Sequence, residues 1–488
     1  MHTALGLRYL YANLGELQLT ACIKEFSIQQ RPIDIAEKLL KHHPSIIGFG
    51  VYIWNVAEVT ATVALLKQIA PNTVIVLGGP EVSHLPDKPA VVDSADYVVM
   101  GAAEESFRIL CQSILSGDRP QQREIHSDEL PLDRLQMPYQ YYTDEDIKNR
   151  LIYVEASRGC PFKCEFCLSS LDKTSNPFEL GPFLDEMDKL HRRGVRNFKF
   201  IDRTFNLKVR SSIAILEFFL QRMSDDLYVH FELVPDNLPD RLKAVIQQFP
   251  KHALQFEIGV QTFDEKIQAL ISRKQENKKT RENLRWLREH THAYIHADLI
   301  FGLPSDTLNN FAQSFDQLVS LKPHEIQLGI LKRLRGAPLN RHNEEYQLRY
   351  NPEPPYNVLC TRDIDFDTMQ RVNRFARYWD MIANSGRFNN TLPLILRDKP
   401  FNNFMQLSDC LYRTVGSTWN ISLRRLFVLL FESLVFAEDI DEHQLFEKMR
   451  MDYERTGEKS SFELLLNNKN KVSRIGVANK RQQKMLKT

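Results

Sequence analysis

The sequence lacks any run of about 18 apolar residues, the length that a helix needs to cross a membrane. The stretch from Met1 to Leu19 also lacks the charged start, apolar core and cleavage site of a secretory signal. Acidic and basic residues nearly balance, 62 against 63, which argues against a polyanion or a membrane surface as the main partner. These absences predict a protein of the cytoplasm with no membrane partner.

Cysteine is scarce too, with seven residues in 488, and they do not follow the pattern of a disulfide framework. Three of them form the motif Cys160-x3-Cys164-x2-Cys167, and no fourth cysteine lies nearby. A structural zinc site needs four protein ligands, so a set of three leaves one position open. Thiolates bind zinc or iron–sulfur clusters. The motif predicts a [4Fe–4S] cluster with one open iron; zinc with a fourth ligand from His or Asp, and buried structural cysteines, are the alternatives.

The first third of the chain alternates short apolar runs with amphipathic stretches, which predicts a doubly wound parallel sheet over residues 1–120. Strands are predicted at 19–28, 45–54, 73–79 and 96–101, and helices at 33–43, 57–70 and 104–115. Ligands of such sheets bind beyond the carboxyl ends of the strands. Gly78 and Gly79 follow one of these ends and would let the backbone approach a ligand closely, although a plain strand-to-loop turn is the reading that this region alone favours.

The opening of the chain is unusual for such a domain. Leu7, Leu10, Leu14 and Leu17 recur at helical spacing, so the chain opens in a helix, whereas doubly wound domains normally open in a strand. An interior strand cannot be lost without leaving its neighbours' backbone groups unpaired. We therefore expect a strand of about 8–15 residues upstream of Met1, which would then not be the ancestral start.

A second alternation of strands and helices begins after a polar, proline-containing linker at 121–150. Strands are predicted at 151–157, 198–202, 228–234, 254–260, 294–302 and 325–331. Six strand–helix units are too few for a closed eight-stranded barrel and predict an open, partial barrel over 151–345. Because barrel chemistry lies at the carboxyl ends of the strands, the cysteines after the first strand would lie at the barrel mouth.

The remainder of the chain is predicted to be mainly helical. Residues 356–466 show helical periodicity, for example at 366–386, and we expect this domain to cover the barrel mouth or its side. Cys360 and Cys410 are interpreted as small core residues, with thiyl chemistry as the alternative. Residues 467–488 contain basic and no acidic residues, which predicts a disordered tail or an RNA-contacting arm.

The cysteine motif resembles that of the radical S-adenosylmethionine (SAM) enzymes, including the aromatic Phe166 before the last cysteine. The resemblance covers about 150–340 and implies a [4Fe–4S] cluster whose open iron takes the amino and carboxylate groups of SAM. Reductive cleavage would then give methionine and a 5′-deoxyadenosyl radical. Other segments resemble the SAM-binding positions of the family at the strand ends. The residues that this implies are Asp202, Glu257, Gln261, Arg273, Asp298 and Gly302.

A doubly wound domain before such a barrel resembles the cobalamin-binding group of these enzymes, and "VIVLGGPEVSH" is similar to its strand-to-loop segment. The Asp-x-His-x-x-Gly signature that supplies a histidine ligand to cobalt is absent. Cobalamin would therefore bind without a protein ligand, through contacts such as those of Gly78 and Gly79. The domain order is similar to that of an uncharacterised bacterial subfamily with a C-terminal domain of unknown function.

The resemblance implies an enzyme that cleaves SAM reductively, with cobalamin-dependent methyl transfer to an unreactive carbon as one outcome. Its expected partner is a reductant protein of the flavodoxin or ferredoxin type; the substrate is unknown. A second hypothesis is modification of RNA or protein, with the N-terminal sheet acting only as a docking platform. A third is a zinc-stabilised binding protein without catalysis.

Overall fold

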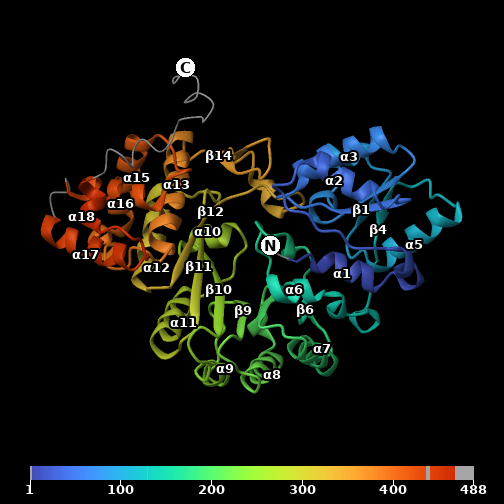
Figure 1. The fold of residues 1–488 in the computed structure, drawn as a ribbon, viewed down its shortest axis with the longest axis horizontal. Helices are drawn as coiled ribbons and strands as arrows, with labels where there is room; N and C mark the ends of the chain where they lie inside the picture. Colours follow the sequence, from blue (N-terminus) through green and yellow to red (C-terminus); the bar gives the residue numbers. More distant parts are fainter. Residues whose placement is uncertain (1–2, 129, 436–439, 468–488) are drawn as a thin grey trace.

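The computed structural model describes residues 3–128, 130–435 and 440–467. These residues form two parallel α/β sheets followed by a helical region, as the sequence predicts, and Figure 1 shows the three parts in order along the chain. No helix in the described ranges is long and apolar enough to cross a membrane.

The N-terminal sheet has four parallel strands in the order β1-β2-β3-β4. The strands are β1 (Ile46–Gly50), β2 (Val74–Gly78), β3 (Tyr97–Met100) and β4 (Glu124–His126). The helices are α1 (Leu5–Ala12), α2 (Pro32–Leu40), α3 (Val56–Ile69), α4 (Val91–Ser94) and α5 (Glu104–Ser116). Side chains of α2, α3 and α4 pack on one face of the sheet and those of α5 on the other, so the sheet is doubly wound.

Two predictions for this region are wrong. Residues 19–28 form no ladder among the described residues, and instead Glu25 accepts hydrogen bonds from Arg8 at 3.0 Å and Arg150 at 2.7 Å. Ion pairs rather than a sheet therefore hold this extended segment. The strand β4 pairs with β3 inside the predicted linker, so the sheet continues past residue 120. The expected strand upstream of Met1 stays a prediction.

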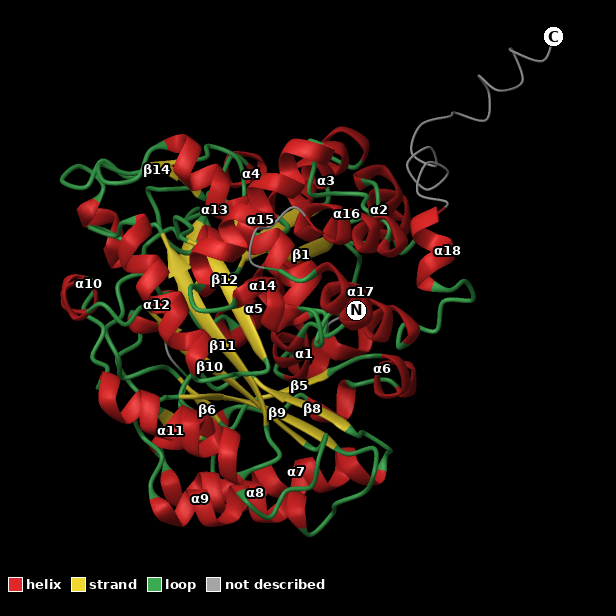
Figure 2. Cartoon of the chain, turned by 90° about the vertical axis from the view of Figure 1, so that its left-hand side faces the viewer, coloured by secondary structure: helices red, strands yellow, loops and turns green. Residues whose placement is uncertain are grey.

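The second sheet has six parallel strands in the order β12-β11-β10-β9-β8-β5, which is the predicted open barrel (Figure 2). The strands are β5 (Ile152–Val154), β8 (Asn197–Phe200), β9 (Tyr228–Leu233), β10 (Leu254–Gln261), β11 (Tyr294–Phe301) and β12 (Glu325–Ile330). The helices around it are α7 (Leu180–Arg192), α8 (Val209–Leu220), α9 (Asp240–Ile246), α10 (Glu265–Leu270), α11 (Asn277–His290) and α12 (Leu308–Ser320).

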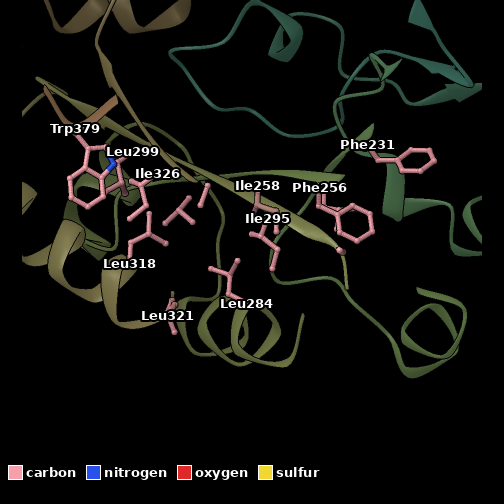
Figure 3. Packing of buried hydrophobic residues seen from close by; sticks show 14 of the residues in the cluster. Phe231, Phe256, Ile258, Leu284, Ile295, Leu299, Leu318, Leu321, Ile326 and Trp379 are labelled. Carbon is pink, nitrogen blue, oxygen red and sulfur yellow. The ribbon is translucent and has the colours of Figure 1, made fainter. Parts of the chain in front are cut away.

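The alternation of side chains along β10 shows which face of the barrel sheet points inward. Every second residue from Leu254 is buried, and Figure 3 shows Ile258 in one apolar layer with Ile295 of β11 and Leu284 of α11. Since successive side chains of a strand point to opposite faces, Glu257 and the backbone at Gly259 belong to the inner face. The barrel therefore turns apolar residues to its helices and polar residues to its interior.

The C-terminal region packs against the side of the barrel. Its helices are α13 (Phe366–Trp379), α14 (Leu392–Leu396), α15 (Pro400–Val415), α16 (Leu423–Val435), α17 (Glu442–Glu454) and α18 (Phe462–Asn467), after a short ribbon of β13 (Arg349–Tyr350) and β14 (Val358–Cys360). Phe315 of α12 contacts Trp379 of α13, with ring centroids 4.8 Å apart. The Asn384 amide donates to the Ile326 carbonyl of β12 at 3.0 Å. The predicted basic tail lies, from residue 468 on, outside the described residues.

Candidate active site

The three cysteines lie on the loop that follows β5, at the carboxyl end of the barrel. All are free thiols; Cys160 is buried, and Cys164 and Cys167 are partly buried. The short strands β6 (Ser157–Arg158) and β7 (Asn176–Pro177) pair antiparallel at the base of the loop. Gly159 opens the loop at φ +88°, where an added Cβ would lie 2.5 Å from the Thr174 carbonyl oxygen. A glycine is required there by both backbone angle and space.

The loop offers three thiols and no fourth ligand of its own. Burial raises the pKa of Cys160, and the Cys164 and Cys167 thiols add to this effect. The carboxylate of Asp172 accepts from the Thr174 amide at 3.0 Å and its hydroxyl at 2.6 Å, and is thus engaged in a local turn. Within the described ranges no three His, Cys, Asp or Glu residues are grouped for a single metal ion. A [4Fe–4S] cluster fits this donor set better than zinc, because each cysteine would bind a different iron.

Glu165, inside the cysteine motif, ties the loop to residues far along the chain. Its buried carboxylate accepts from Ser272 Oγ at 2.6 Å and Arg341 Nη2 at 2.6 Å, and lies 3.0 Å from His342 Nε2. Sequence reasoning missed this residue, since the partners follow it by more than a hundred positions. The loop is therefore held in place before any cofactor binds.

Arg273, predicted to meet the SAM carboxylate, lies against the cysteine loop. Its Nη1 donates to Cys164 Sγ at 3.6 Å, its Nε donates to Gln275 at 3.1 Å, and its Nη2 donates to the carbonyl of Gly259 at the end of β10. The guanidinium also counteracts the rise that burial causes in the pKa of the Cys164 thiol. Hydrogen bonds to ligand sulfurs tune iron–sulfur clusters, so this position suits a residue beside a cluster.

Asp202, after β8, is buried, and its carboxylate is hydrogen-bonded to the segment that enters the cysteine loop. Its carboxylate accepts from the Ala156 amide at 2.9 Å and from Ser157 Oγ at 2.6 Å. Burial raises the pKa of Asp202 to about 7, even though these hydrogen bonds favour the ionised form. In this structure the side chain positions the loop; its predicted contact with the SAM amino group stays a prediction.

The inner face of the barrel carries a cluster of charged side chains. Glu257 Oε2 lies 3.2 Å from His230 Nε2 and 3.3 Å from Lys199 Nζ. The contact with the His230 imidazole, together with the nearby lysine, lowers the pKa of Glu257 to about 2. On the adjacent strand, Asp298 Oδ1 lies 3.2 Å from His296 Nε2. Glu257 and Asp298, both predicted from sequence, thus share one polar surface.

The remaining predicted barrel residues have different surroundings. Gln261 ends β10 at φ +69°, next to a register shift against β11. Phe166 is partly buried against the barrel core. Gly302 has φ +89°, and an added Cβ would lie 2.7 Å from Val358 Cγ1 of β14. Gly302 is therefore required for packing of the C-terminal region, whatever contact it makes with a nucleoside.

The carboxyl edge of the N-terminal sheet contains the predicted glycines. Gly79 has φ +102°, and an added Cβ would lie 2.6 Å from the Val51 carbonyl oxygen, whereas Gly78 has ordinary room. Beyond β1, Tyr52 and Trp54 stack with ring centroids 5.2 Å apart, and Trp54 is 57% exposed. Gly79 thus lets two strand-end loops meet closely, beside an aromatic pair that offers a flat ligand a surface.

A cavity of about 390 Å³ lies beyond the ends of β3 and β4, lined by Ser83, Leu85, Pro86, Lys88, Met100, Glu124 and His126. His84, in the same loop as Gly79, packs against the backbone of Gly336, which has no Cβ to block it. That histidine is used in a contact between domains. The sheet edge therefore fits a cobalamin held by loops and apolar surface, without His84 as a cobalt ligand.

Two buried ion-pair networks join the edges of the two sheets. Arg335, after β12, binds Glu81 of the loop after β2 at 2.8 Å. Arg158, two residues before Cys160, binds Glu104 at the start of α5 at 2.8 Å. Sequence reasoning missed these residues, although it had placed Gly78 and Gly79 at a strand end. Because both contacts join strand-end loops, the carboxyl edge of the N-terminal sheet faces the barrel mouth.

Comparisons with known proteins agree with this arrangement. Family models match a B12 binding domain over residues 1–111, the radical SAM superfamily over 154–318 and a protein of unknown function, DUF4080, over 344–487. The cobalamin-dependent radical SAM methyltransferase TokK of Streptomyces tokunonensis is 26% identical over 67% of this chain and 53% of its own. An uncharacterized methyltransferase of Pyrococcus horikoshii is 26% identical over 43% of this chain and 51% of its own. The chain spans about half the length of the curated relatives it matches.

Solved structures share the fold over most of the chain. The cobalamin-dependent SAM radical enzyme OxsB, with aqua-cobalamin and SAM bound, has a TM-score of 0.63 at 14% identity and covers 96% of this chain and 80% of its own. The radical SAM methyltransferase TsrM from Kitasatospora setae has a TM-score of 0.56 at 16% identity and covers 72% of this chain and 76% of its own.

The partial barrel with its three-thiol loop is the part of the chain that matches the radical SAM superfamily. The chain carries a radical SAM domain, with a B12-binding domain before it and DUF4080 after it. The zinc-protein and docking-platform hypotheses are not favoured by these matches. The cofactors of the family, a [4Fe–4S] cluster, SAM and cobalamin, are those that the domains imply.

Proposed function

We propose that this protein is a cobalamin-dependent radical SAM methyltransferase. The observation that carries the proposal is the junction itself: the thiol loop and the carboxyl edge of the N-terminal sheet face each other, joined by Arg158–Glu104 and Arg335–Glu81. When bound, the cluster supplies the electron that cleaves SAM, and cobalamin supplies a methyl group for an unreactive carbon.

The residues of this chain hold and orient these groups. Cys160, Cys164 and Cys167 would ligate three irons, and Arg273 would hold Cys164 by its hydrogen bond to the sulfur. Glu257 and Asp298 line the barrel interior below the cluster loop, where they would contact the SAM ribose and ammonium or a substrate. Their polar neighbours His230, His296 and Lys199 favour a polar substrate over a lipid.

The test is reconstitution of the full chain without oxygen. Iron and sulfide bound in a four-to-four ratio support the cluster, whereas bound zinc without iron contradicts it. Retention of cobalamin through gel filtration, read from its visible spectrum, tests the N-terminal site. Incubation with reduced flavodoxin or ferredoxin, the reductant class we propose as partner, should then yield 5′-deoxyadenosine.

The proposed SAM contact of Glu257 has its own test. Glu257→Ala should weaken SAM binding, measured by calorimetry on the reconstituted protein, while the brown colour of the cluster remains. Unchanged SAM affinity would show that Glu257 belongs to the substrate side of the barrel instead.

A further inference from the structure

Basic residues of the C-terminal region are concentrated in one stretch. Between residues 371 and 425 there are nine Arg or Lys residues and three acidic ones. The helices that carry most of them, α13, α15 and α16, are neighbours, and Figure 1 shows them together at the end of the molecule away from the N-terminal sheet. The helix α17, by contrast, has four acidic residues and two Lys or Arg, so the excess of basic residues belongs to the stretch 371–425.

Two arginines on successive turns of α13 each cover an aromatic ring. The guanidinium carbon of Arg374 lies 4.3 Å from the centroid of the Tyr412 ring, and that of Arg377 lies 4.5 Å from the centroid of Trp419. Trp419 is 67% exposed, so the face of its ring that Arg377 does not cover is open to a ligand. With Arg387, these four residues form what we call the arginine–aromatic face.

A cleft of about 190 Å³ adjoins Trp419 in this face. Its polar lining comes from Arg377, Arg387, Thr418 and Asn420, and its apolar lining comes from Met381, Ile421, Leu423 and Leu426. Asp380 accepts from Arg377 at 3.2 Å, but among the described residues Arg387 has no ion-pair partner. The buried Nε–H groups of Arg374 and Arg377 also have no hydrogen-bond acceptor among the residues that the structure describes.

We propose that the arginine–aromatic face binds single-stranded RNA. An unstacked base would lie on the side of the Trp419 ring that Arg377 leaves open, and a backbone phosphate would lie between Arg377 and Arg387. Aromatic side chains and guanidinium planes are the surfaces on which proteins stack the unpaired bases of RNA loops. A duplex keeps its bases stacked and could not use the indole in this way. An acidic peptide would use the arginines and leave the indole without a role.

The experiment measures binding of a fluorescein-labelled single-stranded uridine oligonucleotide to the full chain by fluorescence anisotropy. Trp419→Ala should weaken binding roughly tenfold or more, the loss expected for one stacked base. Trp419→Phe should recover part of it. Arg387→Gln should lower the slope of log affinity against log salt by about 0.7, the value for one phosphate contact on a single strand.

Matched variants separate the face from other sources of affinity. Trp54→Ala removes the exposed tryptophan of the N-terminal domain, and Arg450→Gln removes an arginine of α17; neither should change RNA binding. The basic residues after Asn467 remain in every variant, so an effect of Trp419→Ala cannot come from them. Circular dichroism melting checks that each variant is folded.

The comparison ligands decide the identity of the occupant. A poly-glutamate peptide, an RNA duplex and single-stranded DNA of matching sequence should all bind more weakly than the RNA. Equal binding of the peptide, or no loss with Trp419→Ala, would overturn the proposal, and equal binding of DNA would overturn its assignment to RNA. The proposal does not depend on the methyltransferase activity, because the face lies on the C-terminal region.

Discussion

The two parallel sheets present ligands with different surfaces. The strand β2 of the N-terminal sheet is buried along its first four residues, while β10 of the barrel is buried only at alternate residues. Helices cover both faces of the first sheet, so only its strand-end loops remain for a ligand. The barrel has a free inner face, where Glu257 and its partners contribute side chains directly. One site is therefore made by backbone and loops, and the other by side-chain chemistry.

The largest effect that tests this difference is loss of a cluster cysteine. Cys160→Ala, Cys164→Ala or Cys167→Ala should each abolish 5′-deoxyadenosine formation, because the loop contains no spare ligand. The iron content reports loss of the cluster, and the amount of 5′-deoxyadenosine, measured by chromatography, reports loss of SAM cleavage. Cys410→Ala is the matched control and should leave both unchanged. Substantial product from any of the three variants would refute the cluster assignment.

The second effect concerns the contact between the sheets. Arg335→Met would leave the Glu81 carboxylate, whose side chain is 3% exposed, buried without its partner, at a cost of about 3–5 kcal/mol in the free energy of unfolding. The double variant Arg335→Met/Glu81→Leu should regain most of this, because an apolar pair replaces a buried ion pair at little cost. Urea unfolding of the single and the double variant measures both free energies of unfolding.

Arg333→Met is the control for that series. Among the described residues the Arg333 guanidinium forms an ion pair only with Asp87, and both side chains are about a third exposed, so its loss should cost less than about 1 kcal/mol. If Arg335→Met were as mild as Arg333→Met, the two sheets would not depend on this contact for their alignment.

The third effect tests the loop-made site. Gly79→Ala combines a positive φ with a contact to Val51 and should cost about 1–3 kcal/mol of backbone strain, while cobalamin is lost from the N-terminal domain. Gly117 also has a positive φ, +92°, but open space around it. Gly117→Ala should therefore cost about 1–2 kcal/mol and retain cobalamin. Similar cobalamin content in the two variants would mean that strand-end geometry at Gly79 does not form the site.

The barrel shows what a sequence can predict. All six strands were expected in their order, since each combines an apolar run with alternation and a following helix, and the cysteine motif placed the mouth. The loops were harder. Residues 19–28 alternate like a strand, yet Glu25 pairs with Arg150, a partner 125 positions away that no local pattern reveals. The three-residue strand β4 is too short to register as an apolar run.

The candidate site divides in the same way. Glu257 and Asp298 were predicted from the resemblance of their strands to those of the family, with strand alternation as support for Glu257, and their contacts with SAM stay predictions. Glu165 and Arg335 were missed, since each becomes important only through partners that the tertiary fold brings near. Gly302 was predicted as a SAM-binding residue. The structure shows that it also has a packing role, because Val358 of the C-terminal region lies against it, and sequence reasoning could not foresee how that region docks.

The smallest effect is electrostatic and belongs to the inner face of the barrel. The pKa of Glu257 is lowered from 4.5 to about 2, so its ionised form stabilises the folded state above pH 4.5, and this contribution is lost as the pH falls toward 2. The shift corresponds to roughly 3 kcal/mol, which we reduce to about 1–2 kcal/mol because solvent reaches the side chain. Glu257→Gln should therefore lower the unfolding free energy by that amount at neutral pH, and the difference from the unmodified protein should shrink through this acid range. A difference for Glu257→Gln that stayed constant down to pH 2 would mean that shape rather than charge holds the inner face together.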